Sequence, residues 1–295
     1  MLLNRTAHRI GYLGPMKSWN EKKIDSLEQF LNFLILHLNH NIHKGIQICC
    51  VDVLNIDFTN IDFSKIEEDS LDQEKIDIIS NFLSFKNSRI FFFVGKTHFL
   101  GSQIPEVVEE AKVILEKISD FLELIGINQP SILVRVGSAY GNRKETLSRF
   151  CNEVLSLPEK VSTRLVVMND EKPSLFSVTD LLAGVFYTTK TPICFRFLPH
   201  QFNEGGLTSR EALFLSASTW PQEIKPIFIH SESESYDETG APSSPSPSEF
   251  LNFRVPTFNL EIDFILDCKG KEEACVKYML ENKSLKPIII NRVLD

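Results

Sequence analysis

Residues 131–197 constrain the fold more than any other stretch, because they read as strand, helix, strand, helix, strand with few residues between. The three strands are expected at residues 132–136, 164–168 and 192–197. Each is a nearly continuous apolar run, which is typical of a parallel sheet covered by helices on both faces. Helices are expected at residues 143–155 and 177–186, the second opening on a capping-box-like pair, Ser177 and Asp180.

The same alternation continues on both sides of this stretch. Five more strands are expected at residues 9–13, 46–51, 89–94, 226–229 and 262–266, and five more helices at residues 26–38, 73–85, 105–125, 207–220 and 271–281. Eight βα units in 295 residues are the number and size of a (β/α)8 barrel. The sequence therefore predicts an α/β protein with a single TIM-barrel domain over residues 1–295. An open, doubly wound sheet is the alternative.

Two segments do not follow this alternation of strands and helices. Residues 231–248 are acidic and rich in Ser and Pro, so they are too polar to bury surface and are expected to form a flexible loop at the rim of the barrel. Residues 284–295 include an apolar run and are expected to dock on the barrel as a C-terminal tail.

Composition excludes several classes of protein. The longest apolar runs are too short to cross a membrane, and the first residues do not resemble a secretory signal, so we expect a cytoplasmic protein without membrane contact. The six cysteines show neither CxxC nor metal-finger spacing, which predicts reduced, buried thiols. The glycines form no phosphate-binding motif. A formal charge of −8 argues against broad binding to nucleic acid, although it leaves room for a local basic patch.

Polar side chains stand at or just past the carboxyl ends of the central strands. Arg135 ends the strand at 132–136, Asn169 and Asp170 follow the next strand, and Arg196 lies near the end of the third. Parallel α/β folds place their binding sites at this end of the sheet. The rim of the barrel is therefore where function is expected.

Several segments, taken in order, resemble the UV-damage endonuclease family, which belongs with the xylose-isomerase-like and endonuclease IV-like TIM barrels. The segments that carry the resemblance span nearly the whole chain: Arg9-Ile-Gly-Tyr12, Pro105-Glu-Val-Val-Glu-Glu110, Val136-Gly-Ser-Ala-Tyr-Gly-Asn-Arg-Lys144, Asn169-Asp170, Ser177-Val-Thr-Asp-Leu-Leu182, Thr219-Trp220, and Asp263-Phe-Ile-Leu-Asp-Cys-Lys-Gly-Lys-Glu-Glu-Ala274. The resemblance implies a DNA-repair barrel. Its chemistry would depend on divalent metals such as manganese, held by His, Glu and Asp at successive strand ends.

Most of the ligands that the resemblance implies are missing. The corresponding positions read Phe93, Arg135, Met168, Arg196, Pro199, Ile227 and Ile229, while Asp267 retains an acid. Hydrocarbon and guanidinium side chains do not replace oxygen and imidazole ligands. The damage-probing residues that the family carries after the third strand read Lys96 and Thr97 here. The sequence therefore predicts no bound metal and no cofactor.

The polar residues that remain suggest two arrangements. Arg135 and Arg196, with Lys96 nearby, either pair with Asp267 across the ring or hold a small anion such as phosphate or a carboxylate. Tyr12 and Asn169 are further candidates for ligand binding, and Asp267 and His200 are the candidates for catalysis. Arg135, Met168, Arg196 and Asp267 are expected to face one mouth of the barrel.

Three functions follow from these observations. The first is a pseudoenzyme of the UV-damage endonuclease type that binds DNA or another protein, or acts as a scaffold. The second is a diverged but active metal-dependent DNA-repair endonuclease. The third is a protein that binds a small anion, or a metal-independent enzyme, using Arg135, Arg196 and Asp267.

Overall fold

Eight parallel strands form the centre of the structure, a computed structural model that describes residues 8–19, 23–68, 70–95, 98–281 and 286–287. The strands are β1 (Ile10–Leu13), β2 (Ile48–Asp52), β3 (Arg89–Phe93), β4 (Ile132–Val134), β5 (Leu165–Met168), β6 (Ile193–Cys194), β7 (Ile227–His230) and β9 (Asp263–Leu266). They pair in the order β6-β5-β4-β3-β2-β1-β9-β7.

The two end strands of this sheet meet each other. A parallel bridge joins Arg196, just past β6, to Ile229 of β7, and the Ile229 amide donates to the Phe195 carbonyl at 2.9 Å. This bridge closes the sheet into a barrel. The predicted TIM barrel is therefore confirmed, and the open, doubly wound alternative is wrong.

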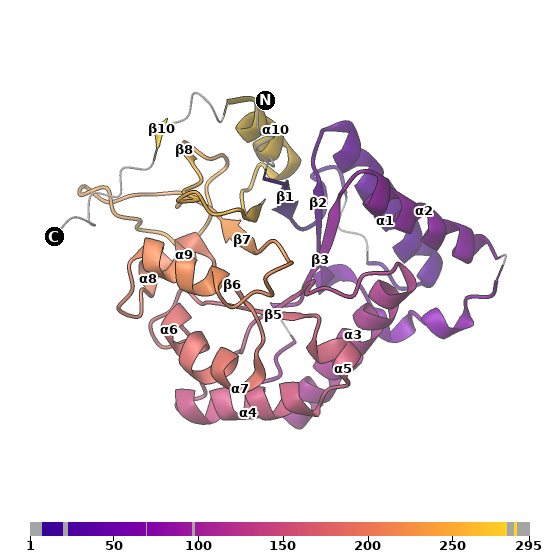
Figure 1. Cartoon of the computed structure of the whole chain (residues 1–295), viewed down its shortest axis with the longest axis horizontal. Helices are drawn as coiled ribbons and strands as arrows, with labels where there is room; N and C mark the ends of the chain where they lie inside the picture. The colour runs from indigo at the N-terminus through magenta and orange to yellow at the C-terminus, as the bar shows by residue number, and fades with distance from the viewer. Residues whose placement is uncertain (1–7, 20–22, 69, 96–97, 282–285, 288–295) are drawn as a thin grey trace.

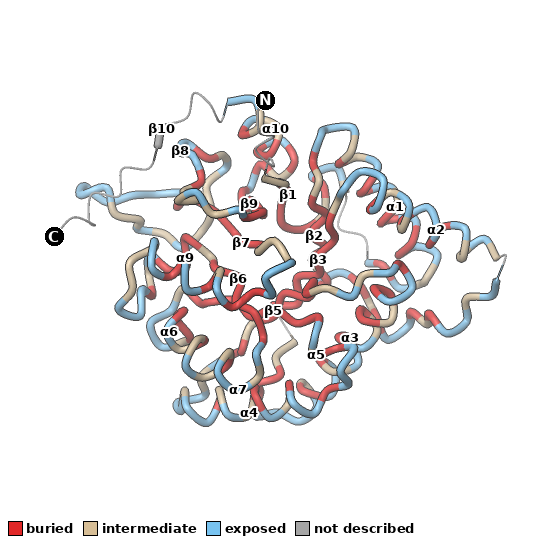
Figure 2. The backbone as a smooth tube through the Cα atoms, viewed as in Figure 1, coloured by how far each residue is buried: buried red, intermediate tan, exposed pale blue. Residues whose placement is uncertain are grey.

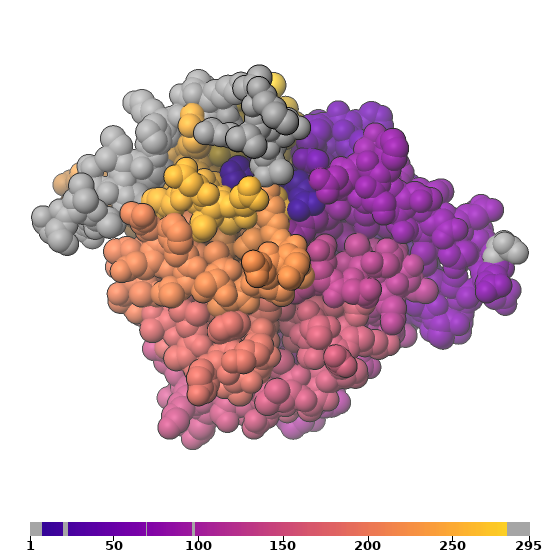
Figure 3. Space-filling view, viewed as in Figure 1, coloured from indigo at the N-terminus to yellow at the C-terminus, as the bar shows by residue number. Residues whose placement is uncertain are grey.

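Helices surround the strands (Figure 1). They are α1 (Leu27–His43), α2 (Leu71–Phe85), α3 (Pro105–Leu124), α4 (Arg143–Ser156), α5 (Glu159–Ser162), α6 (Val178–Asp180), α7 (Tyr187–Thr189), α8 (Phe197–Phe202), α9 (Ser209–Ala217) and α10 (Lys271–Glu281), with a π-helical stretch at Leu181–Phe186 between α6 and α7. The space-filling view shows successive parts of the chain following one another around the molecule, from purple through pink to orange (Figure 3). No helix in the described ranges is long and apolar enough to cross a bilayer.

Local sequence signals explain where several helices begin. Ser26 caps α1 by accepting from the Gln29 amide, and Pro105 occupies the first turn of α3. Ser177 and Asp180 form the reciprocal capping box that the sequence predicts. These signals fix the helix starts, so each amphipathic helix lays its apolar face on the sheet.

The strands are the most continuously buried part of the chain (Figure 2). Alternate strand residues fill the interior of the barrel, and the others pack against the helices. The interior cluster consists of Leu13, Ile48, Cys50, Phe91, Phe93, Leu133, Val166, Met168, Cys194, Trp220, Ile227, Ile229 and Ile265. All six cysteines are buried and free of disulfides.

The structure differs from the predicted elements in two places. Three short 3-10 helices (Val53–Asn55, Phe58–Asn60 and Phe63–Lys65) follow β2, between the strand expected at residues 46–51 and the helix expected at residues 73–85, and they bury Phe58 and Phe63 in the core. The sixth strand ends at Cys194, because Phe197 already begins α8.

The polar segment at residues 231–248 pairs with itself. Antiparallel bridges join Ser233 to Pro247 and Tyr236 to Pro242, and the hydroxyl of Ser233 donates to the Ser244 carbonyl at 2.7 Å. Its flexibility stays a prediction. Of the C-terminal segment 284–295, only β10 (Lys286–Pro287) lies within the described residues, where it pairs with β8 (Phe253–Arg254). The docking of the remaining tail falls outside them.

Candidate functional site at the barrel mouth

Several residues at the predicted ligand positions lie at the carboxyl ends of the strands, but Ile227 is the first residue of β7 and Pro199 lies in α8. Phe93, Met168 and Ile229 belong to the apolar cluster inside the barrel. A Cβ atom placed on Gly95 would lie 3.0 Å from Met168 Cε and 3.1 Å from Arg135 Cδ, so these two side chains meet at the end of β3. Most of the mouth is therefore lined by hydrocarbon rather than by metal-binding groups.

Arg135 pairs with a buried acid on the neighbouring strand. Its Nε and Nη2 atoms both donate to Asp170 Oδ1. The Asp170 side chain is 1% exposed and that of Arg135 is 19% exposed. Burial raises the pKa of Asp170, although Arg135 acts in the opposite direction. Loss of the arginine would thus leave a buried carboxylate without its main cation.

Glu171 joins this pair to the second arginine. Its Oε2 atom lies 3.3 Å from Arg135 Nη2 and 3.8 Å from Arg196 Nη1. Burial acts to raise the pKa of Glu171, but the two arginines outweigh it and the pKa is lowered. Arg135, Asp170, Glu171 and Arg196 form what we call the mouth charge cluster, in which two positive and two negative charges balance.

Asn169 positions Arg196 within this cluster. The Arg196 amide donates to Asn169 Oδ1 at 2.7 Å, and Asn169 Nδ2 donates to the Arg196 carbonyl at 3.1 Å. Asn169 was expected to bind a ligand. Its fully buried amide instead joins the ends of β5 and β6, so its polar atoms are already used within the protein.

The expected pairing of the arginines with Asp267 is wrong. Asp267 is half-buried directly after β9, and its charge is the smallest of several influences that, after burial, raise the pKa of the Cys50 thiol. No ion pair joins Asp267 to Arg135 or Arg196 in the described part of the chain. The strand order explains this, because β4 and β9 lie four strands apart in either direction around the barrel, whereas β4 and β5 are neighbours. Lys96 falls outside the described residues.

Two other candidate residues, Tyr12 and His200, are buried. Tyr12 points toward α1, since the adjacent Leu13 faces the interior, and its hydroxyl lies 2.9 Å from both His37 Nε2 and Asn41 Oδ1. His200 is fully buried in α8 against the Phe195 ring, at 5.1 Å between centroids. Tyr12 is therefore a packed residue, and His200 lies in the helix that follows β6 but is shielded from solvent.

His200 is poorly suited to acid–base chemistry at the mouth. Burial lowers the pKa of the imidazole to about 4, although the Leu207 backbone acts in the opposite direction. The ring is thus neutral at physiological pH and shielded from solvent.

The mouth does not fit the metal centre that the family resemblance implies. Within the described ranges, no three His, Cys, Asp or Glu side chains lie close enough to share a metal ion. The acids that could bind a cation, Asp170 and Glu171, are occupied by arginines. The sequence alone did not predict that Asp170 and Glu171 pair with the arginines. Their position directly after β5, beside the strand that Arg135 follows, is the signal that could have indicated it.

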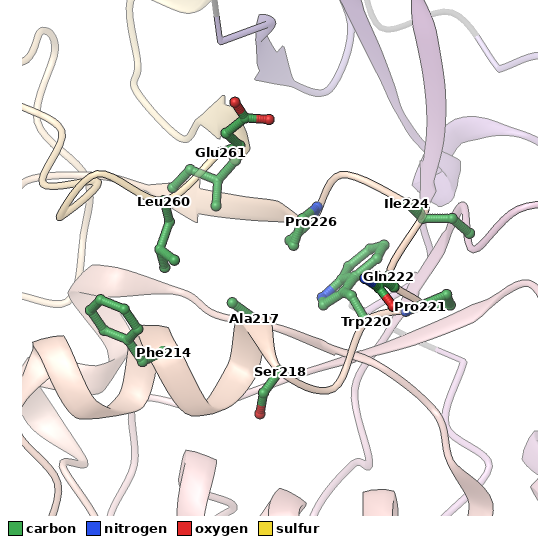
Figure 4. A pocket seen from close by; sticks show the side chains of 11 residues that line it. Phe214, Ala217, Ser218, Trp220, Pro221, Gln222, Ile224, Pro226, Leu260 and Glu261 are labelled. Carbon is green, nitrogen blue, oxygen red and sulfur yellow. The ribbon is translucent and has the colours of Figure 1, made fainter. Parts of the chain in front are cut away.

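One pocket lies at the opposite end of the barrel (Figure 4). It has a volume of about 370 Å³ and is formed where α9 ends and where β7 and β9 begin. Its lining consists of Phe214, Ala217, Ser218, Trp220, Pro221, Gln222, Ile224, Pro226, Leu260, Glu261 and Ile262. Trp220 donates its indole N–H to the Ile193 carbonyl at 2.8 Å, so this polar group is satisfied internally.

Comparison with known proteins agrees with the barrel fold. The sequence model of the family described as UV-endonuclease UvdE matches residues 20–293. The chain belongs to the UV-endonuclease UvdE family. The crystal structure of SacUVDE superposes with a TM-score of 0.77 and 26% identity, covering 95% of this chain and 99% of that chain.

Other proteins share only part of this similarity. A "Putative UV-damage endonuclease" of Acanthamoeba polyphaga mimivirus is 26% identical over 207 residues, and a "UV DNA damage endonuclease" of Bacillus cereus (strain Q1) is 24% identical over 207 residues. These matches cover 68% of this chain but only 62% and 64% of the two relatives. Endonuclease IV from Thermus thermophilus, with a TM-score of 0.59 and 12% identity over 94% of this chain and 98% of that chain, shares the fold.

Proposed function

We propose that this protein is a UV-endonuclease-family barrel that does not hydrolyse DNA and acts as a binding or scaffold protein. The observation that carries the proposal is the mouth charge cluster. Its two arginines occupy positions where the resemblance implies metal ligands, and its two acids neutralise those arginines. A pair of salt-bridged arginines thus takes the place that divalent cations would occupy.

The chemistry of phosphodiester hydrolysis supports the same conclusion. Hydrolysis needs a nucleophilic water that is activated by a metal or a base, and it needs positive charge that is free to approach the phosphate. Asp170 and Glu171 are engaged by Arg135 and Arg196, and the imidazole of His200 is buried. None of these groups is available to activate water.

The hydrogen bonds of Arg135 disfavour the small-anion alternative at that residue, whereas Arg196 Nε is buried without a partner. Two guanidinium groups could hold a phosphate bidentately only if their donors were free. Here Arg135 directs its Nε and Nη2 atoms at Asp170 and Glu171. An added anion at this place would have to displace a carboxylate of the same charge.

DNA is the partner that we propose to test first. The relatives are named for UV-damaged DNA, and the barrel of SacUVDE superposes on nearly the whole of this chain. Binding without cleavage would leave the scaffold useful for recognising a duplex or for recruiting another protein.

Metal analysis and a nicking assay on one preparation test this proposal. Protein purified without added metal would be analysed for Mn and Zn, then incubated with UV-irradiated supercoiled plasmid in Mn²⁺ or Mg²⁺, beside the Bacillus cereus relative as positive control. We expect substoichiometric metal and no nicking above the buffer background. Stoichiometric metal, or Mn²⁺-dependent nicking that Asp267→Asn abolishes, would contradict the proposal and support the active-endonuclease alternative.

A binding measurement on the same protein separates the remaining outcomes. Fluorescence anisotropy of a labelled duplex, with and without UV irradiation, reports DNA binding in the absence of cleavage. Affinity that falls with salt would support DNA as the partner. Absence of binding would direct the search to protein partners.

A further inference from the structure

A second group of charged residues closes the opposite end of the barrel. Arg89 is the first residue of β3 and Asp263 is the first residue of β9, while Arg9 and Lys225 precede β1 and β7 by one and two residues. We call these four residues the floor cluster. Arg89 reaches from β3 to β9, three strands away in the sheet order, so its guanidinium lies across the floor of the barrel.

A single carboxylate serves all three cations of this cluster. Asp263 Oδ2 accepts from Arg9 Nε at 2.7 Å and from Arg89 Nη1 at 3.1 Å. Asp263 Oδ1 accepts from the Arg9 amide at 2.9 Å and lies 3.2 Å from Lys225 Nζ. Both oxygens of Asp263 are therefore fully used.

The Arg89 guanidinium is left with donors that have no acceptor. Its Nη1 atom donates to Asp263 and to the Lys225 carbonyl, but Nε and Nη2 are buried without any partner. The side chain is 3% exposed, and its guanidinium stacks over the Phe91 ring at 4.7 Å. Buried guanidinium N–H groups are costly when unpaired, so a partner is expected at this position.

Arg164 is as buried as Arg89, but each of its guanidinium nitrogens has a hydrogen-bond acceptor. It is also 3% exposed, and its Nε, Nη1 and Nη2 atoms donate to Ile127 O, Lys160 O and Asn128 Oδ1. The two arginines precede or begin strands of the same barrel. Arg143 and Arg196 each leave one buried Nε without a partner, whereas Arg89 leaves both Nε and Nη2.

The floor cluster also carries excess positive charge. Arg9, Arg89 and Lys225 surround one acid, and burial lowers the pKa of Arg89 only to about 10, which leaves it charged at neutral pH. A neutral water molecule could accept hydrogen bonds from Arg89, but it would not reduce this excess.

We propose that the floor cluster binds a small monovalent anion of the chloride class on the Nε and Nη2 donors of Arg89. The site is shielded from solvent because Arg89 and Asp263 are almost completely buried. The anion accepts the unpaired N–H groups and offsets the charge that Asp263 alone does not neutralise. This site lies at the far end of the barrel from the mouth charge cluster and is independent of it.

Thermal unfolding at constant ionic strength tests the proposal. Chloride would replace gluconate stepwise in the buffer of the full-length protein. An anion that binds only the folded state raises the midpoint by mass action, so we expect a rise of about 3 °C at ten times the dissociation constant, growing with the logarithm of the chloride concentration above it. Arg89→Met should make the midpoint independent of chloride. Arg164→Met, the matched control, should lower the midpoint yet retain the same chloride response.

A crystal grown in bromide gives a direct readout that does not depend on variant stability. Anomalous scattering from one bromide within hydrogen-bond distance of Arg89 Nε or Nη2 is the expected result. A flat chloride titration of the wild type, an unchanged response in Arg89→Met, or ordinary water without anomalous signal at these nitrogens would each overturn the proposal.

Discussion

The ion pair between Arg135 and Asp170 is the part of the mouth whose energy is easiest to measure. Removing one partner of a buried pair typically costs about 3 to 5 kcal/mol, because the other charge is left uncompensated. Asp170 is 1% exposed, but Arg135 is 19% exposed and also reaches Glu171, which places the cost at the low end. We expect Arg135→Met to lower the free energy of unfolding by about 3 kcal/mol and Asp170→Asn by about 2 kcal/mol.

The double variant is the informative one. When both partners are removed, neither leaves an unpaired charge in the barrel, so Arg135→Met with Asp170→Asn should cost about 2 kcal/mol less than the sum of the single changes. Urea unfolding followed by circular dichroism, compared at equal m values, gives the three free energies. Additivity within about 0.5 kcal/mol would refute the pairing.

Two control cycles make the result specific. Lys160 and Asp120 form an exposed ion pair at 2.6 Å, and their coupling should stay below about 1 kcal/mol. Asp267→Asn should show no coupling to Arg135→Met, because the two residues lie on opposite sides of the barrel. Coupling with Asp267 equal to that with Asp170 would mean that the arginine changes partners in solution.

Two further predictions concern buried positions elsewhere. Burial lowers the pKa of His230 to about 3. Below about pH 6.5 the unfolded chain therefore binds a proton that the folded chain does not, so this residue should lower the free energy of unfolding by about 2 kcal/mol at pH 5. His230→Phe should remove this contribution, so the melting temperature should depend less steeply on pH between about 7 and 5. An unchanged slope would show that the imidazole is not shielded. A Cβ on Gly11 would lie 2.3 Å from the Ile48 carbonyl oxygen, so Gly11→Ala should cost roughly 3 kcal/mol of stability by forcing β1 and β2 apart. Gly126→Ala is the control, because no atom lies within 4 Å of the added carbon and the variant carries only the strain of its positive φ. Equal melting temperatures for Gly11→Ala and wild type would contradict the close packing of β1 and β2.

Much of the fold could be predicted because its signals are local. Strand runs such as 89–94 and helix starts such as Pro105 and Ser177 depend on neighbouring residues, and the structure places β3 and α3 where they indicate. The irregular stretch after β2 was harder, since the short 3-10 helices that bury Phe58 and Phe63 carry no periodic pattern. Their burial depends on α1 and α3, which only the folded structure brings to them.

The candidate site was predictable as a place but not as a set of contacts. Strand ends in a parallel barrel share one rim, which correctly brought Arg135 and Arg196 together. Which acid the arginines contact depends on the order of the strands around the barrel. The sequence alone does not give this order, so Asp267 was predicted as the partner rather than Asp170 or Glu171. The burial of His200 could not be predicted for a related reason: the chain turns into α8 directly after Arg196, and the imidazole of His200 is buried there.

The closure of the barrel has a consequence for how the protein opens. Four residue pairs align β7 with β9, but a single bridge, Arg196 to Ile229, joins β6 to β7. Local opening should therefore begin at this junction, and the Ile229 amide should be among the first in the barrel to exchange with deuterium. Because Arg196 also interacts with Glu171, events at the mouth and separation of the two strands are thermodynamically linked. A partner that contacts the mouth and holds Arg196 in place would make the whole cylinder open less often.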